Sequence, residues 1–299
     1  MKKLTSLFKS INPFSNKDTD NKILYIVKIL LTTQLIYFIT LIGTETLIIG
    51  ISYLFGYNAT DNQMPQNITS IVSFFGYLIP IMAFILYTKK ITKSKSDRIG
   101  LDKNYKTFIK GTLIGLLTIV LSISPLILCG AIKFEGLNEN INWLFIILFF
   151  FAYLTQSAME EVICRGFIFH RLKEKIHIII AIIINIGFFM VGHIDKMFDA
   201  GILIGIIGIV NAILIGLIFT VLTIKDKNIY SAIGFHWIWN FSLACIIGSN
   251  LSGNDVTNSI FSMTSTNEFL TGSSYGIESS IICTIVYGIV LLMLLMKKK

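Results

Sequence analysis

Three polar groups of residues interrupt stretches of the chain that are otherwise apolar. The first is the run EEVICR at residues 160–165. The second pairs Phe189 with His193, and the third pairs His236 with Asn240. Ionisable side chains are costly inside lipid, so within membrane segments they normally face an interior cavity and mark a functional site. The pattern therefore predicts a chemical site buried inside a membrane protein.

Helix geometry predicts different roles for the two glutamates of the first group, Glu160 and Glu161. Glu161 and Arg165 are four residues apart and share a helix face, where an ion pair forms readily. Glu160 points about 100° away from Glu161. One carboxylate is then neutralised and the other is left free, and a free glutamate in a partly dry cavity suits a general base that acts on water. The alternative is a structural Glu–Arg pair that holds two helices together.

The two histidines in apolar stretches favour a catalytic interpretation over a structural one. His236 and Asn240 are four residues apart, so both side chains reach one side of a helix. They could donate hydrogen bonds to a developing oxyanion, or the histidine could bind a metal. A single histidine in such a stretch is more often a packed hydrogen-bonding residue, but two beside a Glu-Glu-Arg group reverse that preference. The chain has no HExxH motif, so the zincin arrangement is absent.

Composition predicts the elements that must position these residues. Of the 299 residues, 54% are hydrophobic and 14% are charged, and the mean hydropathy is +0.75. Crossing a hydrocarbon core of roughly 30 Å takes about 20 helical residues. We therefore expect an all-α, multi-pass transmembrane helical bundle. Its eight predicted spans are residues 29–55, 70–88, 111–132, 143–168, 177–194, 202–223, 229–248 and 279–296.

The distribution of basic residues predicts the orientation of the spans. Of the 25 Lys and Arg residues, 22 fall on one side, before the first span, at 89–110, 171–175 and 225–227, and at the C-terminus. The other side has only Lys133 and Lys196. By the positive-inside rule we expect both termini in the cytoplasm, with the protein in a bacterial plasma membrane. Residues 1–28 are expected to form a basic, interfacial N-terminal segment, and residues 29–299 a single transmembrane domain.

The net charge of +8 is mainly a signal of this topology. It also favours contact with anionic lipid headgroups, whereas the pattern gives no support for binding nucleic acid. The four cysteines show no paired spacing and are expected to be free thiols. Residues 249–278 are rich in Ser, Thr, Asn and Gly, which predicts a long outer loop.

The three motifs, taken in order, resemble those of a known family. Glu160-Glu161-x-x-x-Arg165-Gly166, Phe189-x-x-x-His193 and His236-x-x-x-Asn240 are similar to the motifs of the CPBP, or Abi, intramembrane proteases. That family includes the type II CAAX prenyl endopeptidases and bacterial relatives linked to peptide processing and bacteriocin immunity. The resemblance covers about 80 residues, from 160 to 240.

The resemblance implies an endopeptidase whose active site lies within the bilayer and is accessible from the cytoplasm. Glu160 with His193 would activate the attacking water. His236 and Asn240 would bind the oxyanion or help to hold a metal. The remaining motif residues, Glu161 and Arg165, would form a supporting pair. Whether a divalent metal such as zinc takes part is left open, and its candidate ligands are Glu160, His193 and His236.

Helix lengths put these residues at different expected depths. At about 1.5 Å per residue from the basic ends of the predicted spans, Glu160 lies roughly 16 Å deep, His236 roughly 10 Å and His193 roughly 27 Å. Straight helices would spread the site too widely. A turn at residues 171–179, followed by a later start of the fifth span, would bring His193 to a shallower position.

The substrate expected on these grounds is a membrane-associated peptide or protein segment, such as a prenylated CAAX tail or a bacterial leader or signalling peptide. The alternative from another class is a non-catalytic membrane partner, such as a bacteriocin-immunity or scaffold protein with the same fold. A transporter is disfavoured, because the chain has no internal repeat of the kind that many transporters show. The sequence does not indicate an oligomeric state.

Overall fold

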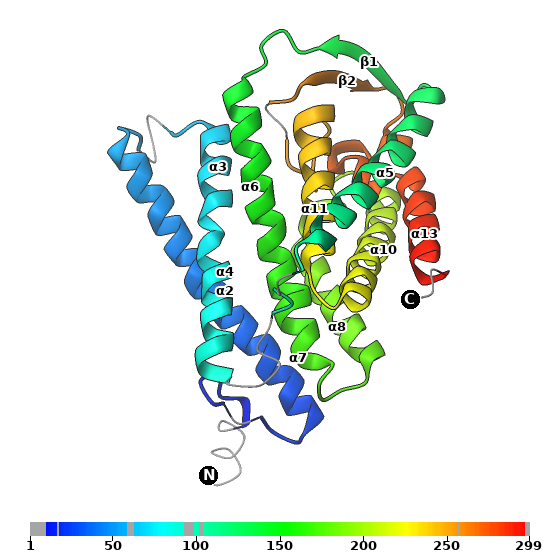
Figure 1. Ribbon diagram of the computed structural model, residues 1–299. Coiled ribbons are helices and arrows are strands. Elements are labelled where there is room, and N and C mark those ends of the chain that lie inside the picture. The colour runs from blue at the N-terminus through cyan, green and yellow to red at the C-terminus, as the bar shows by residue number, and fades with distance from the viewer. Residues whose placement is uncertain are drawn as a thin grey trace.

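The computed structural model describes residues 10–16, 18–58, 63–92, 99–101, 104–255 and 258–296. Within these residues the protein is a bundle of helices with one small sheet at one end, and the start of α2 (Lys22–Leu54) and α7 (His170–Leu172) lie at the opposite end (Figure 1). Much of the predicted interfacial segment, residues 1–9 and 17, lies outside the described residues. The predicted helical membrane bundle is confirmed.

The first half of the chain contributes mainly long helices, and two helices of this half continue into π-helical turns. The elements are α2 (Lys22–Leu54), α3 (Gln66–Gly76), α4 (Leu78–Tyr87), η1 (Thr88–Thr92), α5 (Lys106–Leu128), β1 (Ile132–Leu137), α6 (Trp143–Glu161), η2 (Val162–Phe169) and α7 (His170–Leu172). The second half comprises α8 (Ile178–Val191), α9 (Ile194–Met197), α10 (Ile202–Asp226), α11 (Tyr230–Phe241), η3 (Ser242–Ile247), β2 (Phe261–Ser265), α12 (Glu268–Thr271), η4 (Ser273–Tyr275), η5 (Ile277–Ser279) and α13 (Ile281–Met296).

Six of the described helical segments are long and apolar enough to cross a membrane. They are Lys22–Leu54, Gln66–Thr92, Lys106–Leu128, Trp143–Leu172, Ile202–Asp226 and Tyr230–Ile247. The fifth and eighth predicted spans correspond to α8 and α13, which are apolar but have only 14 and 16 residues. At about 1.5 Å per residue these two helices reach about 21 and 24 Å, which is short of a core of roughly 30 Å. The protein is an integral membrane protein.

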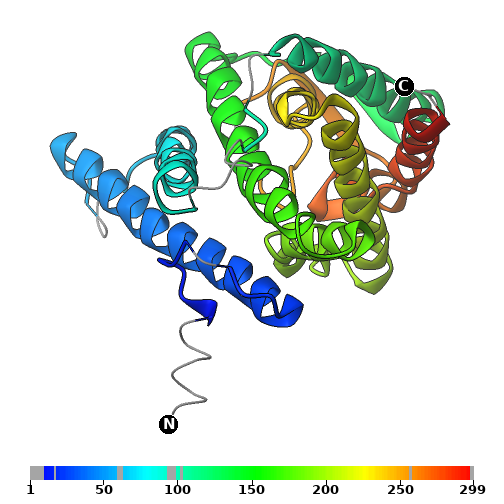
Figure 2. The same cartoon turned by 60° about the horizontal axis from the view of Figure 1, so that its bottom comes forward.

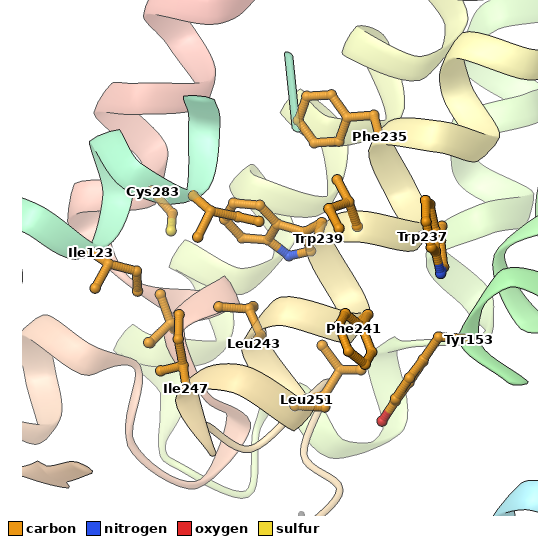
Figure 3. Packing of buried hydrophobic residues seen from close by; sticks show 14 of the residues in the cluster. Ile123, Tyr153, Phe235, Trp237, Trp239, Phe241, Leu243, Ile247, Leu251 and Cys283 are labelled. Atoms are coloured by element: carbon orange, nitrogen blue, oxygen red, sulfur yellow. The ribbon is translucent and has the colours of Figure 1, made fainter. Parts of the chain in front are cut away.

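Helix α11 lies at the centre of the bundle, packed against α5, α6 and α10 (Figure 2). Every residue from Ser231 to Phe241 is buried. Figure 3 shows the aromatic side chains of this helix among residues from α5, α6, η3 and α13. A helix that is apolar on all sides is stable only when it is surrounded, so the sequence FHWIWNF belongs to the core of the bundle and its polar members face protein atoms.

Glycines allow α5 and α11 to cross at very short range. A Cβ atom on Gly111 would lie 1.9 Å from the backbone oxygen of Ser231. A Cβ atom on Gly234 would lie 2.3 Å from the backbone oxygen of Phe108. Side chains at these positions would therefore force the two backbones apart, and close approach between small residues is a common way of packing helices in membranes. This crossing holds α11, and with it His236 and Asn240, against the rest of the bundle.

A small antiparallel sheet, which the sequence analysis did not predict, covers the end of the bundle opposite α7. Strand β1 pairs with β2, so the predicted outer loop at 249–278 contains ordered structure. Hydrogen bonds from Lys133 and Thr264 hold the pKa of Glu135 below its usual value on this surface. The short length of both strands, five and six residues, explains why their periodicity is hard to recognise in the sequence.

Candidate active site

The acidic motif lies where α6 passes into the π-helix η2. The guanidinium of Arg165 donates from Nη1 to Oε1 of Glu161 over 2.9 Å, and both side chains are fully buried. This is the ion pair expected from the spacing of four residues. Glu160 points to the other side, and its side chain keeps 19% of its exposure. π-helical turns often occur at functional sites, because they change the direction of the side chains that follow.

Arg165 is enclosed by groups from two neighbouring helices. Its guanidinium carbon lies 4.6 Å from the ring centroid of Phe189 on α8 and 5.1 Å from that of Phe219 on α10. Its Nη2 atom donates to the backbone oxygen of Gly216 over 3.4 Å. Aromatic faces stabilise a desolvated cation, so the motif phenylalanine supports the arginine. The sequence analysis singled out Phe189 but not Phe219, which lies outside the three motifs.

His236 on α11 lies between the two carboxylates. Its Nδ1 atom is 3.0 Å from Oε1 of Glu161, and a carboxylate oxygen only accepts, so Nδ1 carries the hydrogen. Its Nε2 atom is 3.7 Å from Oε2 of Glu160. The ring stacks on Phe219 with a centroid separation of 5.0 Å. Two carboxylates, Arg165 and a doubly protonated His236 would together make the cluster electrically neutral.

The Oε2 atom of Glu160 is buried and accepts no hydrogen bond from the described residues. A buried carboxylate oxygen without a donor is costly, and such atoms call for a water, an ion or a ligand as partner. The other oxygen, Oε1, accepts from Nε2 of Gln156. Glu160 is therefore held in place through one oxygen, while the other remains available beside the imidazole of His236.

Gln156 links the first and third motifs, and the sequence analysis missed it. Its Oε1 atom accepts from Nδ2 of Asn240 over 2.9 Å, while its Nε2 atom donates to Glu160. Because the carboxylate can only accept, this orientation of the amide is required, and Asn240 must present its Nδ2 group. One signal could have found Gln156, since it precedes Glu160 by four residues and so shares its helix face.

His193 occupies a different position from the one that the spacing suggests. It follows the end of α8, and its Nδ1 atom donates to the backbone oxygen of Phe189 over 3.0 Å. Its ring lies 4.7 Å from the ring of Phe189, measured between centroids. Phe189 also makes an edge contact with His236 at 6.2 Å. The histidine whose ring nitrogen approaches the carboxylate of Glu160 is thus His236. The ring of Phe189 lies between the rings of the two histidines.

All four residues predicted to be catalytic line one cavity of about 480 Å³. Glu160 lies about 18 Å along the helix from Leu172, and His193 lies about 22 Å along the chain from Ile178. The depths of Glu160 and His193 therefore differ less in the structure than the sequence predicts. The reason is that α7 ends at Leu172 and the chain turns before α8 begins. The four lining residues are Glu160, His193, His236 and Asn240.

The candidate metal ligands are not gathered into a metal site. Among the described residues, no three His, Cys, Asp or Glu side chains lie close enough to hold a metal ion. His193 uses Nδ1 for a backbone carbonyl, and Glu160 and His236 approach each other without a third donor. The donor set of the described residues therefore does not fit a metal in this arrangement.

Comparison with known proteins adds one finding. Residues 142–242 match the model of the family described as Type II CAAX prenyl endopeptidase Rce1-like. The matched range runs from the start of α6 to the end of α11 and contains every residue predicted for the site. No curated protein and no solved structure matches the chain. The family resemblance seen in the motifs is confirmed for this range.

Proposed function

Residues 142–242 belong to the Rce1-like family of CAAX-type membrane proteases, and from this premise we propose that the protein is an intramembrane endopeptidase. It hydrolyses a peptide bond in a membrane-associated peptide or protein. One observation carries the proposal: Oε2 of Glu160 accepts no hydrogen bond from the part of the chain that the structure describes, and it lies 3.7 Å from Nε2 of His236 in the wall of the cavity. A general base needs such a free oxygen within reach of the water that it deprotonates.

In the proposed reaction Glu160 accepts a proton from a water molecule in the cavity. The resulting hydroxide attacks the carbonyl carbon of the scissile bond and forms a tetrahedral oxyanion. His193, whose Nδ1 hydrogen is used by Phe189, offers Nε2 as an acceptor that orients this water. Glu160 then returns the proton to the amine that leaves as the carbon–nitrogen bond breaks.

The oxyanion is bound by His236 and Asn240. Asn240 uses one hydrogen of Nδ2 for Gln156 and retains a second one. His236 donates from Nε2 in its protonated form, with Nδ1 anchored on Glu161. Donors fixed in advance around a developing negative charge typically contribute a factor of about 100 to 1,000 to kcat each. Glu161 and Arg165 act as the supporting pair that orients the imidazole.

The experiment compares Glu160→Gln with wild-type protein at matched membrane abundance. The amide keeps the size and the contact to Gln156 but cannot take a proton from water. We expect loss of cleavage of a farnesylated fluorogenic CAAX peptide, and accumulation of a precursor in the membrane peptidome of cells that carry only this variant. Glu45→Gln, which replaces an exposed glutamate on α2, is the matched control and should behave as wild type.

Two results separate the alternatives. If the wild-type protein does not cleave the CAAX peptide but cells with only Glu160→Gln still accumulate a precursor, the protease function stands and its substrate is a different peptide. Full function of Glu160→Gln in both assays would overturn catalysis and favour a non-catalytic membrane partner. Repeating the cleavage assay of the wild-type protein with a metal chelator tests separately whether cleavage requires a metal. We expect unchanged cleavage, because the described side chains do not form a metal site.

A further inference from the structure

The cavity has a second wall to which the three motifs do not contribute. Four of its lining residues, Gln34, Tyr37, Phe74 and Tyr77, come from α2, α3 and the junction of α3 with α4. Helices α2–α4 lie on one side of α6, and α10 and α11 lie on the other, in both Figure 1 and Figure 2. The family match begins at residue 142, so it assigns no role to this wall. A substrate in the cavity would therefore contact residues outside the motifs.

The ring of Tyr77 is fixed beside the motif face of α6. It stacks on Phe74 with a centroid separation of 5.8 Å, and Phe74 packs on Tyr153 of α6 at 5.2 Å. Along α6, Tyr153 is followed by Gln156 and Glu160 at helical spacing, so the three side chains share one face and line the cavity together. This packing holds the phenol of Tyr77 in a defined place relative to Glu160.

Helix α2 is held against the junction of α3 with α4. The hydroxyl of Thr44 donates to the backbone oxygen of Gly76 over 3.3 Å. A Cβ atom on Gly76 would lie 2.5 Å from Cγ2 of Thr44, so the two helices are in close contact at this point. Tyr37 precedes Thr44 by about two helical turns and shares its face of α2. The phenols of Tyr37 and Tyr77 therefore belong to helices that are packed closely together.

The hydroxyl groups of Tyr37 and Tyr77 are available for a ligand. Both side chains are half-buried, and neither hydroxyl makes a hydrogen bond to a residue that the structure describes. Tyr25 on α2 differs, because its hydroxyl donates to the backbone oxygen of Arg171 over 2.9 Å. The carboxylate of Glu160 acts electrostatically on both free phenols, which places them near the reacting groups. A buried tyrosine hydroxyl usually has a hydrogen-bond partner, so we expect the substrate to supply one.

A peptide bound between the two walls needs hydrogen-bond donors on both sides. In an extended peptide the carbonyl oxygens of successive residues point in opposite directions. With the scissile carbonyl facing His236 and Asn240, the carbonyls of the two neighbouring residues face the wall of α2–α4. Backbone groups without a partner are costly inside a membrane protein.

We propose that Tyr37 and Tyr77 bind these two neighbouring carbonyls, each by donating a hydrogen bond from its hydroxyl. The substrate class is then a peptide segment that is extended at its scissile bond, because a helical segment satisfies its own carbonyls and would leave both hydroxyls without a partner. The assignment rests on the proposed protease function.

The test measures binding and cleavage separately on the full-length protein in detergent micelles. Binding of the farnesylated CAAX peptide is measured in the Glu160→Gln background, with Tyr37→Phe, Tyr77→Phe or both added. Cleavage is measured on the same phenylalanine variants with Glu160 intact. Phenylalanine keeps the ring and its packing, so only the hydroxyl is lost. The matched control is Tyr53→Phe, because Tyr53 lies on α2 but is 65% exposed and does not line the cavity.

We expect each phenylalanine variant to raise Kd and KM about 3- to 10-fold, and the double variant about 10- to 100-fold, as for the loss of one or two hydrogen bonds. The value of kcat should change less than twofold, because the substrate and the transition state share these contacts. Tyr53→Phe should leave all three quantities unchanged. A wild-type Kd for the double variant would overturn the proposal, and so would a lower kcat at unchanged Kd.

A modified peptide tests the carbonyl contacts themselves. An (E)-alkene in place of the peptide group next to the scissile one keeps the extended shape but has no carbonyl oxygen. Its Kd should exceed that of the parent peptide, and this loss should be at least three times smaller when both tyrosines are phenylalanine. Equal losses in the two backgrounds would overturn the contact. Failure of the protease function has a different sign, namely undiminished cleavage by Glu160→Gln, and it leaves the comparison of Kd values unaffected.

Discussion

The buried pair of Glu161 and Arg165 should be one of the largest single sources of stability that mutation can remove. Both side chains are fully buried, and the carboxylate accepts from Arg165 at 2.9 Å and from His236 at 3.0 Å. Arg165→Met removes the permanent cation and leaves the carboxylate with the imidazole alone. Breaking a buried pair by removing one partner typically costs about 3 to 5 kcal/mol. We expect a loss in this range.

A double-mutant cycle separates the interaction energy of Glu161 with Arg165 from the loss of packing that each substitution also causes. Removing both charges with Glu161→Gln and Arg165→Met leaves no buried unpaired ion, so the double variant should lose less than the two single losses combined. The expected coupling is about 2 kcal/mol or more. Arg165→Lys should recover only part of the loss, because it keeps the charge but not the planar contact between Phe189 and Phe219.

The assay is the free energy of unfolding in mixed micelles, obtained by titrating a denaturing detergent against a mild one. The control pair is Lys133 and Glu135, whose side chains are 67% and 36% exposed, and its variants should give no measurable change. Strict additivity in the cycle, or a loss below about 1 kcal/mol for Arg165→Met, would refute the argument, because water would then be screening the pair.

Two further predictions follow from contacts outside the motifs. Gln156→Met keeps the volume but removes the donor to Glu160, so kcat/KM on the CAAX peptide should fall about 10- to 100-fold at unchanged membrane abundance, as expected for a hydrogen bond to a charged group; wild-type activity would remove Gln156 from the site. Gly111→Ala should lower the midpoint of detergent unfolding by pushing α5 from α11, whereas Gly187→Ala, where a Cβ meets nothing within 4 Å, should not. Equal behaviour of the two alanine variants would contradict the close crossing.

Local patterns in the sequence were sufficient to predict most of the membrane spans and the contacts between residues of one helix. Long apolar runs predict helices because lipid leaves backbone groups no other partner, and the Glu161–Arg165 pair follows from a spacing of four residues. The fifth and eighth spans are less well predicted, because apolar composition does not reveal where a helix ends. The sheet was missed for a related reason, since the partner strands are separated by more than 120 residues and each is short.

The sequence by itself determined that this is a helical membrane protein with a family-like set of acidic, histidine and amide residues in a fixed order. Tertiary structure alone decided which of them meet. His236 contacts both glutamates, Gln156 joins Glu160 to Asn240, and His193 is held by the backbone of Phe189. The physical reason is that spacing along a chain defines the face of one helix, whereas contacts between helices depend on crossing distances and helix ends, which the packing of the whole bundle determines.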